Sequence, residues 1–375
     1  MAEVEPEWTI GVEEEYQLIN AETRELAPRS GRVLPQARDV VGEEVQPEVY
    51  LSQIEVATPV CHTLREVRAE LVRLRRGVIE AAARDGNRVA AAGTHPFSHW
   101  DAQPLTPKDR YRGIAAEYQQ IARELVIFGC HVHVGLRDPE ARVEVMNRVR
   151  VWLAPLLALT ANSPFWLGSD TGYASFRTEL WNRFPTAGPP QLFESRAEYE
   201  ALVEALVATS SIEDATKIYW DVRLPERVGT VEFRVTDVCM TVDEAVMVAG
   251  LVRALVRTCH EQALRGEPFV RARPELLRAA HWRAARYGLE ADLIDVRALR
   301  AVPAHELIED LLSFVRPALE TDAAWDEVST LVRETMRRGT GAQRQRQEYQ
   351  RTGRLEDVVD LIAAETARGT GAGEQ

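Results

Sequence analysis

The sequence contains few cysteines, no long apolar run and no excess of basic residues. Its four cysteines among 375 residues are widely separated and form no Cys-x-x-Cys pair, so we expect reduced, buried thiols instead of a disulfide framework. No apolar run approaches the roughly 20 residues of a membrane-spanning helix. The first ten residues, MAEVEPEWTI, have neither the basic end nor the apolar core of a signal peptide. We therefore expect a cytoplasmic protein.

Acidic residues outnumber basic ones. The chain has 58 Asp and Glu against 45 Lys and Arg, a formal net charge of -13. A nucleic-acid backbone would be repelled over most of such a surface, which argues against general nucleic-acid binding. The hydrophobic content of 45% is sufficient for one large core or two modest domains. Without a long linker or an internal repeat, we expect one catalytic domain over residues 1–368, helical from about residue 270, and a disordered tail over 369–375.

Two kinds of hydrophobic pattern alternate irregularly along the chain. Segments of period two predict strands over 9–19, 50–60, 88–93, 126–136, 217–224 and 230–238. Helical periodicity predicts helices over 64–85, 107–125, 139–161, 196–210, 243–265, 274–286, 303–320, 323–338 and 355–367. This order does not match a regular parallel βαβ array. It predicts an α+β fold, in which helices cover one face of an antiparallel sheet and the other face is open for a site.

The first predicted strand carries two carboxylates on one face. With a period of two, Glu13 and Glu15 project from the same side as Gln17. The opposite face consists of Ile10, Val12, Tyr16 and Leu18. Like charges so placed repel unless solvent, an arginine or a cation neutralises them. A solvated strand face and a cation site are both compatible with this segment.

A second acidic stretch surrounds the next predicted strand. Glu55 stands between Ile54 and Val56, so its carboxylate points away from these apolar neighbours. Glu48 has the opposite parity. It reaches the face of Glu55 only if the chain bulges or if Glu48 precedes the strand proper. Otherwise Glu48 is an ordinary surface acid.

Imidazole and guanidinium groups follow on later strands. His131 and His133 share one face of their predicted strand, an arrangement that suits a metal, a substrate phosphate or mutual hydrogen bonds. Glu232 and Arg234 share the polar face of the strand over 230–238, where a simple salt bridge is the alternative to a site. Four strands thus offer charged groups on their non-core faces.

The stretch over residues 162–188 is rich in aromatic residues, glycine and arginine. Loops on rigid scaffolds often carry recognition groups. Arg177 and Arg183 have the forked geometry that clamps a carboxylate or phosphate, although each can also brace the loop. If the site must exclude water, this loop is the first candidate for a mobile cover.

Seven segments together resemble a known family. They are GVEEEY (11–16), QIEVATPV (53–60), GCHVHVGL (129–136), the loop over 162–188, GTVEFRVTD (229–237), HWRAARYGL (281–289) and GTGAQRQR (339–346). In this order, and over nearly the whole chain, they are similar to the carboxylate-amine ligases of the bacterial glutamate-cysteine ligase type 2 group, within the glutamine-synthetase-like superfamily. Each segment alone is weak evidence.

The resemblance implies a curved antiparallel sheet that forms an open funnel, with helices on its outer face, where acids from several strands hold magnesium ions beside ATP. By motif, the implied metal ligands are Glu13, Glu15, Glu48, Glu55, His131 and Glu232. We assign catalytic roles to Glu55, Arg234 and Arg177, and ATP contacts to His133, Arg183 and Arg234. His133 departs from more distant glutamate-cysteine ligases, which resemble one another in having an amide side chain there.

The implied activity is ATP-dependent amide formation through an acyl phosphate, with ATP and Mg²⁺ as cofactors. Glutamate and cysteine are the leading substrates, but no motif identifies the amine pocket, so a related amine stays open. Because His131, His133 and nearby acids are also compatible with a water-activating metal, a metal-dependent amide hydrolase is the alternative. An ATP-binding regulatory protein without turnover is a third possibility. No interface signature decides whether the chain forms a homodimer.

Overall fold

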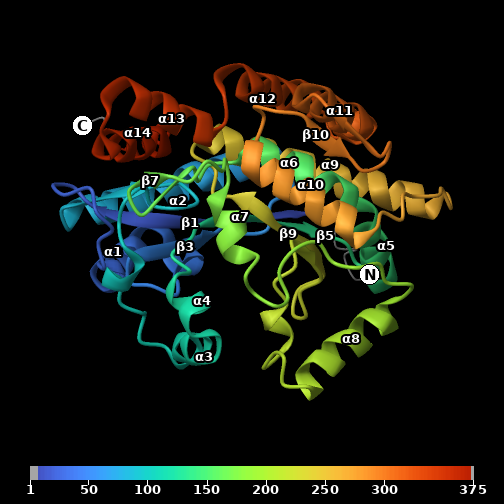
Figure 1. The fold of residues 1–375 in the computed structure, drawn as a ribbon, viewed down its shortest axis with the longest axis horizontal. Helices are drawn as coiled ribbons and strands as arrows, with labels where there is room; N and C mark the ends of the chain where they lie inside the picture. Colours follow the sequence, from blue (N-terminus) through green and yellow to red (C-terminus); the bar gives the residue numbers. More distant parts are fainter. Residues whose placement is uncertain (1–6, 373–375) are drawn as a thin grey trace.

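An antiparallel sheet of seven strands lies at the centre of the molecule (Figure 1). The computed structural model describes residues 7–372. The strand order is β2-β3-β1-β5-β9-β8, and β4 pairs with the end of β1. The predicted α+β class is confirmed. The strands are β1 (Ile10–Asn20), β2 (Val45–Pro47), β3 (Gln53–Ala57), β4 (Asn87–Ala90), β5 (Gly129–Gly135), β8 (Val222–Arg223) and β9 (Thr230–Asp237).

Helices cover one side of this sheet. In Figure 1 they lie above it, while α3, α4 and α8 project below. Core-facing residues of β1, β5 and β9, such as Val12, Val132 and Phe233, are buried in one cluster with apolar residues of the covering helices. The covering helices include α2 (Leu64–Arg84), α5 (Pro139–Val149), α6 (Leu153–Thr160), α9 (Val242–Leu264), α10 (Pro274–Tyr287), α11 (Ala304–Thr321) and α12 (Trp325–Arg338).

The other elements surround this core. The remaining helices are α1 (Ser30–Val41), α3 (Asp109–Tyr118), α4 (Gln120–Arg123), α7 (Phe176–Trp181), α8 (Arg196–Ala208), α13 (Gly341–Thr352) and α14 (Leu355–Ala367). Two small hairpins pair β6 (Phe165–Trp166) with β7 (Ser169–Asp170), and β10 (Leu293–Asp295) with β11 (Arg300–Val302). Short 3₁₀ turns occupy Gly42–Glu44, Trp100–Ala102, Arg150–Trp152 and Ala215–Lys217.

Helix boundaries differ from the sequence prediction where local chemistry competes with periodicity. The predicted helix over 107–125 is divided at Gln119, which adopts a positive φ of 49°. Helix α13 was not predicted, because its residues are polar around nearly the whole circumference. A capping box between Thr340 and Gln343 begins this helix, and left-handed Gly353 ends it. Helix α1 was also missed, since Pro35 lies inside it.

A buried ion pair joins the sheet to α2. Glu14 lies on the core face of β1, and its carboxylate accepts hydrogen bonds from Arg75 Nε at 3.0 Å and from the Tyr16 hydroxyl at 2.5 Å. Arg75 also donates to the carbonyl oxygens of Cys239 and Met240 at 2.9 and 3.1 Å. Both charged side chains are fully buried. The pair therefore ties β1, α2 and the connection from β9 to α9 at one point.

The described chain continues past α14 to residue 372. Thr370 is buried, and its carbonyl oxygen accepts a hydrogen bond from Arg76. Of the tail predicted over 369–375, residues 373–375 lie outside the described part of the chain. The single catalytic domain over residues 1–368 stays a prediction. Among residues 7–372, no helix is both long enough and apolar enough to cross a membrane.

Candidate active site

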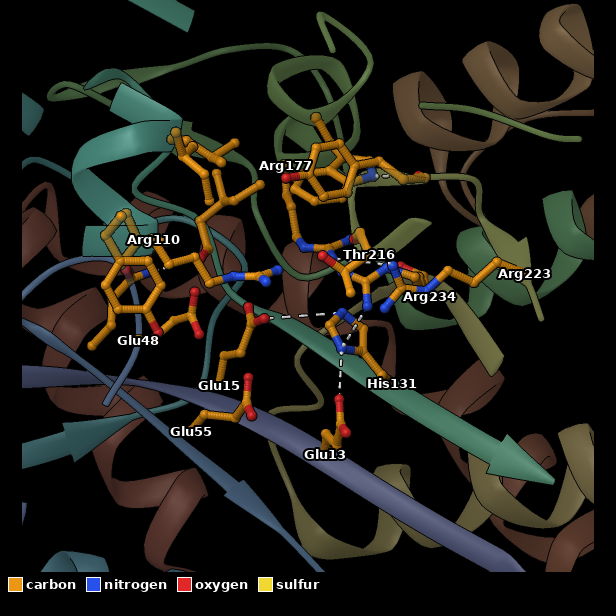
Figure 2. Close-up of a pocket in the computed structure, with 18 residues that line it drawn as sticks. Glu13, Glu15, Glu48, Glu55, Arg110, His131, Arg177, Thr216, Arg223 and Arg234 are labelled. Carbon is orange, nitrogen blue, oxygen red and sulfur yellow. Dashed lines mark hydrogen bonds and ion pairs between the residues drawn. The ribbon is translucent and has the colours of Figure 1, made fainter. Parts of the chain in front are cut away.

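A cavity of about 220 Å³ opens on the polar face of the sheet (Figure 2). Strands β1, β3 and β5 form its floor, and α3 and α7 contribute to its walls. Apolar and aromatic side chains line one part: Tyr111, Ile114, Leu125, Ile127, Trp181 and Tyr219. The charged lining consists of Glu13, Glu15, Glu48, Glu55, Arg110, His131, Arg177, Arg223 and Arg234.

Strand register brings the predicted groups together in opposite pairs. Glu15 of β1 stands opposite Glu55 of β3, and Glu13 stands opposite His131 of β5. Directly opposed residues share one face and have Cβ atoms about 4.5–5.5 Å apart. The period-two patterns therefore placed these side chains on the correct face, and the pairing of β1 between β3 and β5 makes them neighbours.

Glu48 joins this group from outside the strands. It follows β2 and precedes β3, so the second of the two alternatives for Glu48 is the one that the structure adopts. Burial, reinforced by the charge of Glu15, raises the pKa of Glu48 to about 7. Burial also raises the pKa of Glu55 well above its usual value, and the charge of Glu48 adds to this effect. Within residues 7–372, neither Glu48 nor Glu55 forms an ion pair with a basic side chain.

A second group of potential ligands lies at the centre of the sheet. Oxygen and nitrogen atoms of Glu13, His133 and Glu232 all lie within 4.8 Å of one another. His133 Nε2 is 3.4 Å from Glu13 Oε1 and 4.0 Å from Glu232 Oε1. Burial alone would raise the pKa of Glu13, but hydrogen bonds with His131 and His133 hold it well below its usual value. The arrangement can hold a cation.

His131 lies between the two acidic groups. Its Nδ1 is 3.2 Å from Glu13 Oε2, and its Nε2 is 3.9 Å from Glu15 Oε1. Burial and the neighbouring Arg234 charge lower the pKa of His131, which favours the neutral imidazole. The sequence prediction assigned His131 to metal and His133 to ATP. The distances group His133 with Glu13 and Glu232, and they give His131 a bridging position.

Two arginines hold Glu232. Arg223 Nε lies 2.6 Å from one carboxylate oxygen, Arg223 Nη2 lies 3.1 Å from the other, and Arg234 contacts the same carboxylate. Although burial alone would raise the pKa of Glu232, the charges of Arg234 and Arg223 bring it far below its ordinary value. The salt bridge considered for Glu232 and Arg234 is thus present. It leaves a carboxylate that is ionised at neutral pH.

Arg177 reaches the cavity from α7 across the start of β5. Its Nη2 donates to the carbonyl oxygen of Arg234 at 3.4 Å, and its side chain is 4% exposed. A Cβ atom added to Gly129 would lie 2.3 Å from Arg177 Nη2, so a larger residue there would displace the guanidinium from its present position. Arg177 Nε is buried without a hydrogen-bond partner in the described part of the chain. The group can bind an anion in the cavity.

One of the predicted arginines lies outside the cavity, and an arginine that was not predicted lines it. Arg183 does not line the cavity, because its Nη1 pairs with Glu124 at 2.5 Å and its Nε donates to Leu180 O. Arg110 of α3 lines the cavity on the same side as Glu48 (Figure 2), and its positive charge opposes the rise in the pKa of Glu48. Its sequence neighbours show only helical periodicity, so no local signal marks Arg110 as part of a site.

A second cavity, also of about 220 Å³, adjoins the first along β1. Glu13 lines both cavities. The second is lined mainly by small and aliphatic residues, and His133 and Thr230 form its polar edge. His133 Nδ1 lies 3.0 Å from the Thr230 hydroxyl oxygen. Glu13 therefore lies where a polar cavity and a more apolar cavity meet.

Comparisons with known proteins identify the family. The family model described as "Glutamate-cysteine ligase family 2(GCS2)" matches residues 9–361. The chain belongs to this family. A relative in glutamate-cysteine ligase family 2 from Rhodopirellula baltica, named "Putative glutamate--cysteine ligase 2", is 45% identical over 370 residues, covering 96% of each chain. One of the same name from Herpetosiphon aurantiacus is 41% identical, covering 96% of this chain and 94% of the relative.

Solved structures agree with this assignment at the level of the fold. Glutamate-cysteine ligase from Francisella tularensis, in complex with AMP, matches with a TM-score of 0.69 at 12% identity, covering 97% of this chain and 90% of that one. A bifunctional glutathione synthetase from Pasteurella multocida gives 0.70 at 15% identity, with coverage of 97% and 52%. The resemblance drawn from the seven sequence segments is confirmed. Membership of glutamate-cysteine ligase family 2 makes the protein an ATP-dependent carboxylate-amine ligase.

Proposed function

We propose that this ligase joins L-glutamate to an amine through an acyl phosphate, with L-cysteine as the leading amine. One observation carries the proposal: carboxylates from three strands and the segment before β3 gather near Arg177 and Arg234, and one of them, Glu13, lines both cavities. Phosphoryl transfer to a carboxylate brings two anions together, so it requires this density of cation-binding and cationic groups. The names of the close relatives support glutamate and cysteine as the pair.

Magnesium fits the acids of the site. Glu48 and Glu55 are half-buried near Glu15 without a basic partner among the described residues, and hard carboxylate oxygens are the ligands that Mg²⁺ prefers. We assign one Mg²⁺ group to Glu15, Glu48 and Glu55. A second consists of Glu13 and Glu232 with an imidazole of His131 or His133. Bound Mg²⁺ would neutralise negative charge on the phosphates of ATP.

The two cavities suit different substrates. The more apolar one has the character expected for a nucleoside, with His133 and Thr230 at the edge that faces the acids. The polar one presents Arg177, whose guanidinium suits the α-carboxylate of glutamate. In this arrangement Arg234, which lines the polar cavity beside Glu232, contacts the transferred phosphoryl group. The amine then enters beside Tyr111 and Trp181.

The reaction follows from this orientation. A glutamate side-chain oxygen attacks the γ-phosphorus of ATP, and the bond from that phosphorus to the β,γ-bridging oxygen breaks to release ADP. The neutral amine nitrogen then attacks the acyl carbon. Its carbon–oxygen bond to phosphate breaks, and inorganic phosphate leaves with the proton that the amine loses. The aromatic wall around the amine limits the access of water to the acyl phosphate.

Trapping the acyl phosphate tests the proposal. The wild-type protein, incubated with ATP, Mg²⁺, glutamate and hydroxylamine, should form glutamyl hydroxamate and one ADP for each hydroxamate. Glu55→Gln, which removes one carboxylate charge from the buried group, should lower this rate by at least about 100-fold. A panel of other acids and amines identifies the preferred pair. Intact ATP with cleavage of an amide would instead establish the hydrolase alternative.

A further inference from the structure

Two of the seven sequence segments that resemble the ligase family lie in the C-terminal helices and have no place in the cavity. The segments over residues 281–289 and 339–346 lie on or beside α10 and α13, and neither lines the first cavity. Both contact the stretch that precedes Arg177. Ala285 of α10 accepts backbone hydrogen bonds from Ala174 and Ser175 at 2.8 and 2.9 Å. Residues distant in sequence therefore hold the segment that leads to the Arg177 side chain.

A buried contact joins α13 to Asn162. Gln345 is 1% exposed, and its Nε2 donates to both the carbonyl oxygen and Oδ1 of Asn162, at 3.1 and 2.8 Å. A Cβ atom added to Gly341 would lie 2.0 Å from the same Oδ1. The first turn of α13 thus packs directly against Asn162. A side chain at residue 341 would displace it.

Hydrogen bonds continue from Asn162 to Arg177 through Asp237. The backbone N–H of Asn162 and the hydroxyl of Ser163 donate to Asp237 Oδ2 at 2.8 and 2.7 Å. The hydroxyl of Ser175 donates to Asp237 Oδ1 at 2.8 Å. The backbone N–H of Arg177 donates to Ser163 Oγ at 3.1 Å. Asp237 is fully buried at the end of β9. Asp237 therefore accepts hydrogen bonds from both ends of the segment over residues 162–175, which precedes Arg177.

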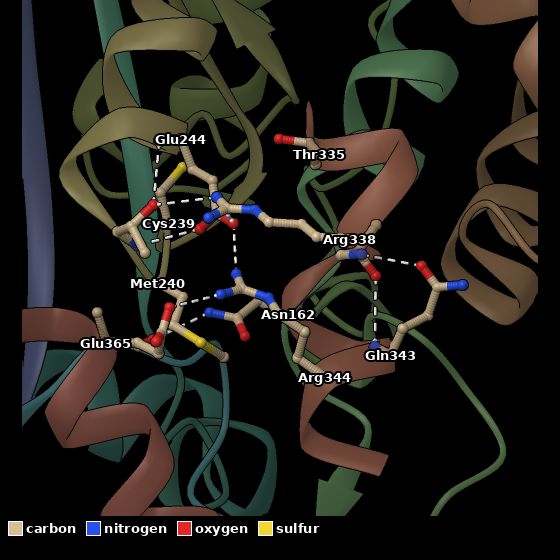
Figure 3. Close-up of polar contacts among 12 residues, drawn as sticks. Asn162, Cys239, Met240, Glu244, Thr335, Arg338, Gln343, Arg344 and Glu365 are labelled. Carbon is tan, nitrogen blue, oxygen red and sulfur yellow. Dashed lines mark hydrogen bonds and ion pairs between the residues drawn. The ribbon is translucent and has the colours of Figure 1, made fainter. Parts of the chain in front are cut away.

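Charged contacts join helix α13 to neighbouring helices (Figure 3). Arg344 bridges Glu244 of α9 and Glu365 of α14, with 2.8 Å between Nη1 and the Glu365 carboxylate. Arg338, the last residue of α12, also donates from Nη2 to Glu244, at 2.9 Å. The two carboxylates have side chains 8% exposed. Helix α13 cannot shift without breaking buried ion pairs, so it is a fixed support for Asn162.

We propose that Gln345 is a positioning residue, which sets the location of the Arg177 guanidinium in the cavity through Asn162 and Asp237. The C-terminal helices then belong to the catalytic machinery and are not only a cover for the sheet. The inference rests on the proposed function in one respect, that Arg177 binds the carboxylate of the acid substrate. A small displacement of such a group weakens substrate binding and orientation strongly.

The first experiment compares Gln345→Leu with Gln350→Leu. Both glutamines lie on α13, but Gln350 is exposed and makes no hydrogen bond through its side chain in the described part of the chain. We expect Gln345→Leu to raise the KM for glutamate roughly tenfold, and to leave the KM for ATP within about twofold of wild type. Gln350→Leu should match wild type. A lower folded fraction with unchanged KM for glutamate would reduce Gln345 to a structural role.

A double-mutant cycle tests whether Gln345 acts through Arg177. In an Arg177→Ala background, Gln345→Leu should cause no further rise in the KM for glutamate, because the group that it positions is gone. Additive effects would overturn the inference. If Gln345→Leu fails to fold, Gln345→Asn shortens the side chain by one methylene and takes its place in the same cycle.

A crystal structure of the Gln345 variant supplies a readout that needs no activity. The Arg177 guanidinium should move away from Gly129 in Gln345→Leu and stay in place in Gln350→Leu. An unmoved Arg177 in the Gln345 variant would overturn the inference. If the wild-type protein forms no hydroxamate with glutamate, the proposed substrate is wrong, and the crystal structures still decide the role of Gln345.

Discussion

At the scale of single residues, the missing side chain of Gly129 decides where Arg177 can lie. A Cβ atom there would stand 2.3 Å from Arg177 Nη2, 2.9 Å from Cζ and 3.1 Å from His131 Nε2. These are two functional groups of the proposed site. Gly129 does not have a positive φ, so alanine is compatible with the backbone and the conflict is purely one of space.

Gly129→Ala should therefore affect activity much more than stability. Displacement of Arg177 by about 1 Å is expected to lower kcat/KM for glutamate by roughly 100-fold. The far-ultraviolet circular dichroism should stay unchanged. Gly31→Ala is the matched control, because an added Cβ there meets no atom within 4 Å. Wild-type kcat/KM in Gly129→Ala would show that the guanidinium does not need its present position.

A buried histidine outside the site makes stability depend on pH. His95 is fully buried, and burial lowers its pKa to about 3. Its Nδ1 accepts hydrogen bonds from the backbone N–H groups of Phe97 and Ser98, at 3.2 and 2.9 Å. Its Nε2 lies 2.9 Å from Arg24 O, to which it donates as the neutral tautomer. The folded protein thus holds His95 neutral.

Below its ordinary pKa of about 6.5, His95 favours the unfolded chain, which binds the proton that the folded protein excludes. Its contribution to stability is complete above pH 6.5 and is lost as the pH falls towards 3. At pH 5 the loss is about 2 kcal/mol in the free energy of unfolding. Urea unfolding at pH 7 and pH 5 measures it. His95→Asn should reduce the difference between the two pH values, and an unchanged difference would assign it to other groups.

At the scale of elements, the ion pair between β1 and α2 supports the strand that carries Glu13 and Glu15. Glu14 is the neighbour of both acids and points to the opposite face, where Arg75 binds it. Alternation along β1 thus places a structural carboxylate between two site carboxylates. Burial of both partners makes the loss of one far more costly than the loss of a surface pair.

Arg75→Met should lower the free energy of unfolding by about 3–5 kcal/mol, because it leaves the Glu14 carboxylate buried without its partner. The double variant Glu14→Gln, Arg75→Met should recover part of this loss. Arg333→Met serves as a control, since the exposed pair of Arg333 with Glu309 is expected to contribute less than about 1 kcal/mol. Equal losses in Arg75→Met and Arg333→Met would contradict the assigned role.

At the scale of the whole molecule, the walls of the cavity differ in how firmly they are held. The segment over 162–177 is attached to β9, α10 and α13 by the buried hydrogen bonds described above. Helices α3 and α4 project from the body (Figure 1) and pack around a small cluster of Tyr111, Ile114 and Ala122. A cover that moves during turnover is drawn from weakly packed segments. These contacts favour α3–α4 as the mobile cover of the cavity, in place of the first half of the loop predicted over residues 162–188.

Hydrogen exchange tests this difference. Backbone amides of α3 and α4 should exchange faster than those over residues 162–177, and should become protected when ADP, Mg²⁺ and glutamate are added together. Amides of α8, which also projects below the sheet, serve as a control that does not line the cavity. Slow exchange in α3–α4 before ligand addition would contradict this expectation. Ligand-induced protection confined to residues 178–188 would show that the loop over 162–188 is the mobile cover.

The sequence by itself determined the faces of the strands. Because side chains alternate along a strand, the local pattern was sufficient to put Glu13, Glu15, Glu55 and Glu232 on polar faces, and the segments in order identified the family. Their metal-binding roles stay predictions. The same period of two puts Glu14 on the face of β1 opposite to Glu13 and Glu15. Only the structure shows that Arg75 is the partner of Glu14.

Tertiary structure decided which of these faces meet and what else joins them. Glu48 reaches the cavity from a segment before β3, Arg110 from α3, and Gln345 supports Arg177 from almost 170 positions away in the sequence. Arg183 belongs to the same segment over residues 162–188 as Arg177, but it pairs with Glu124 and does not line the cavity. Periodicity describes neighbours along one element. Contacts between elements depend on how the whole chain packs, so no local pattern contains them.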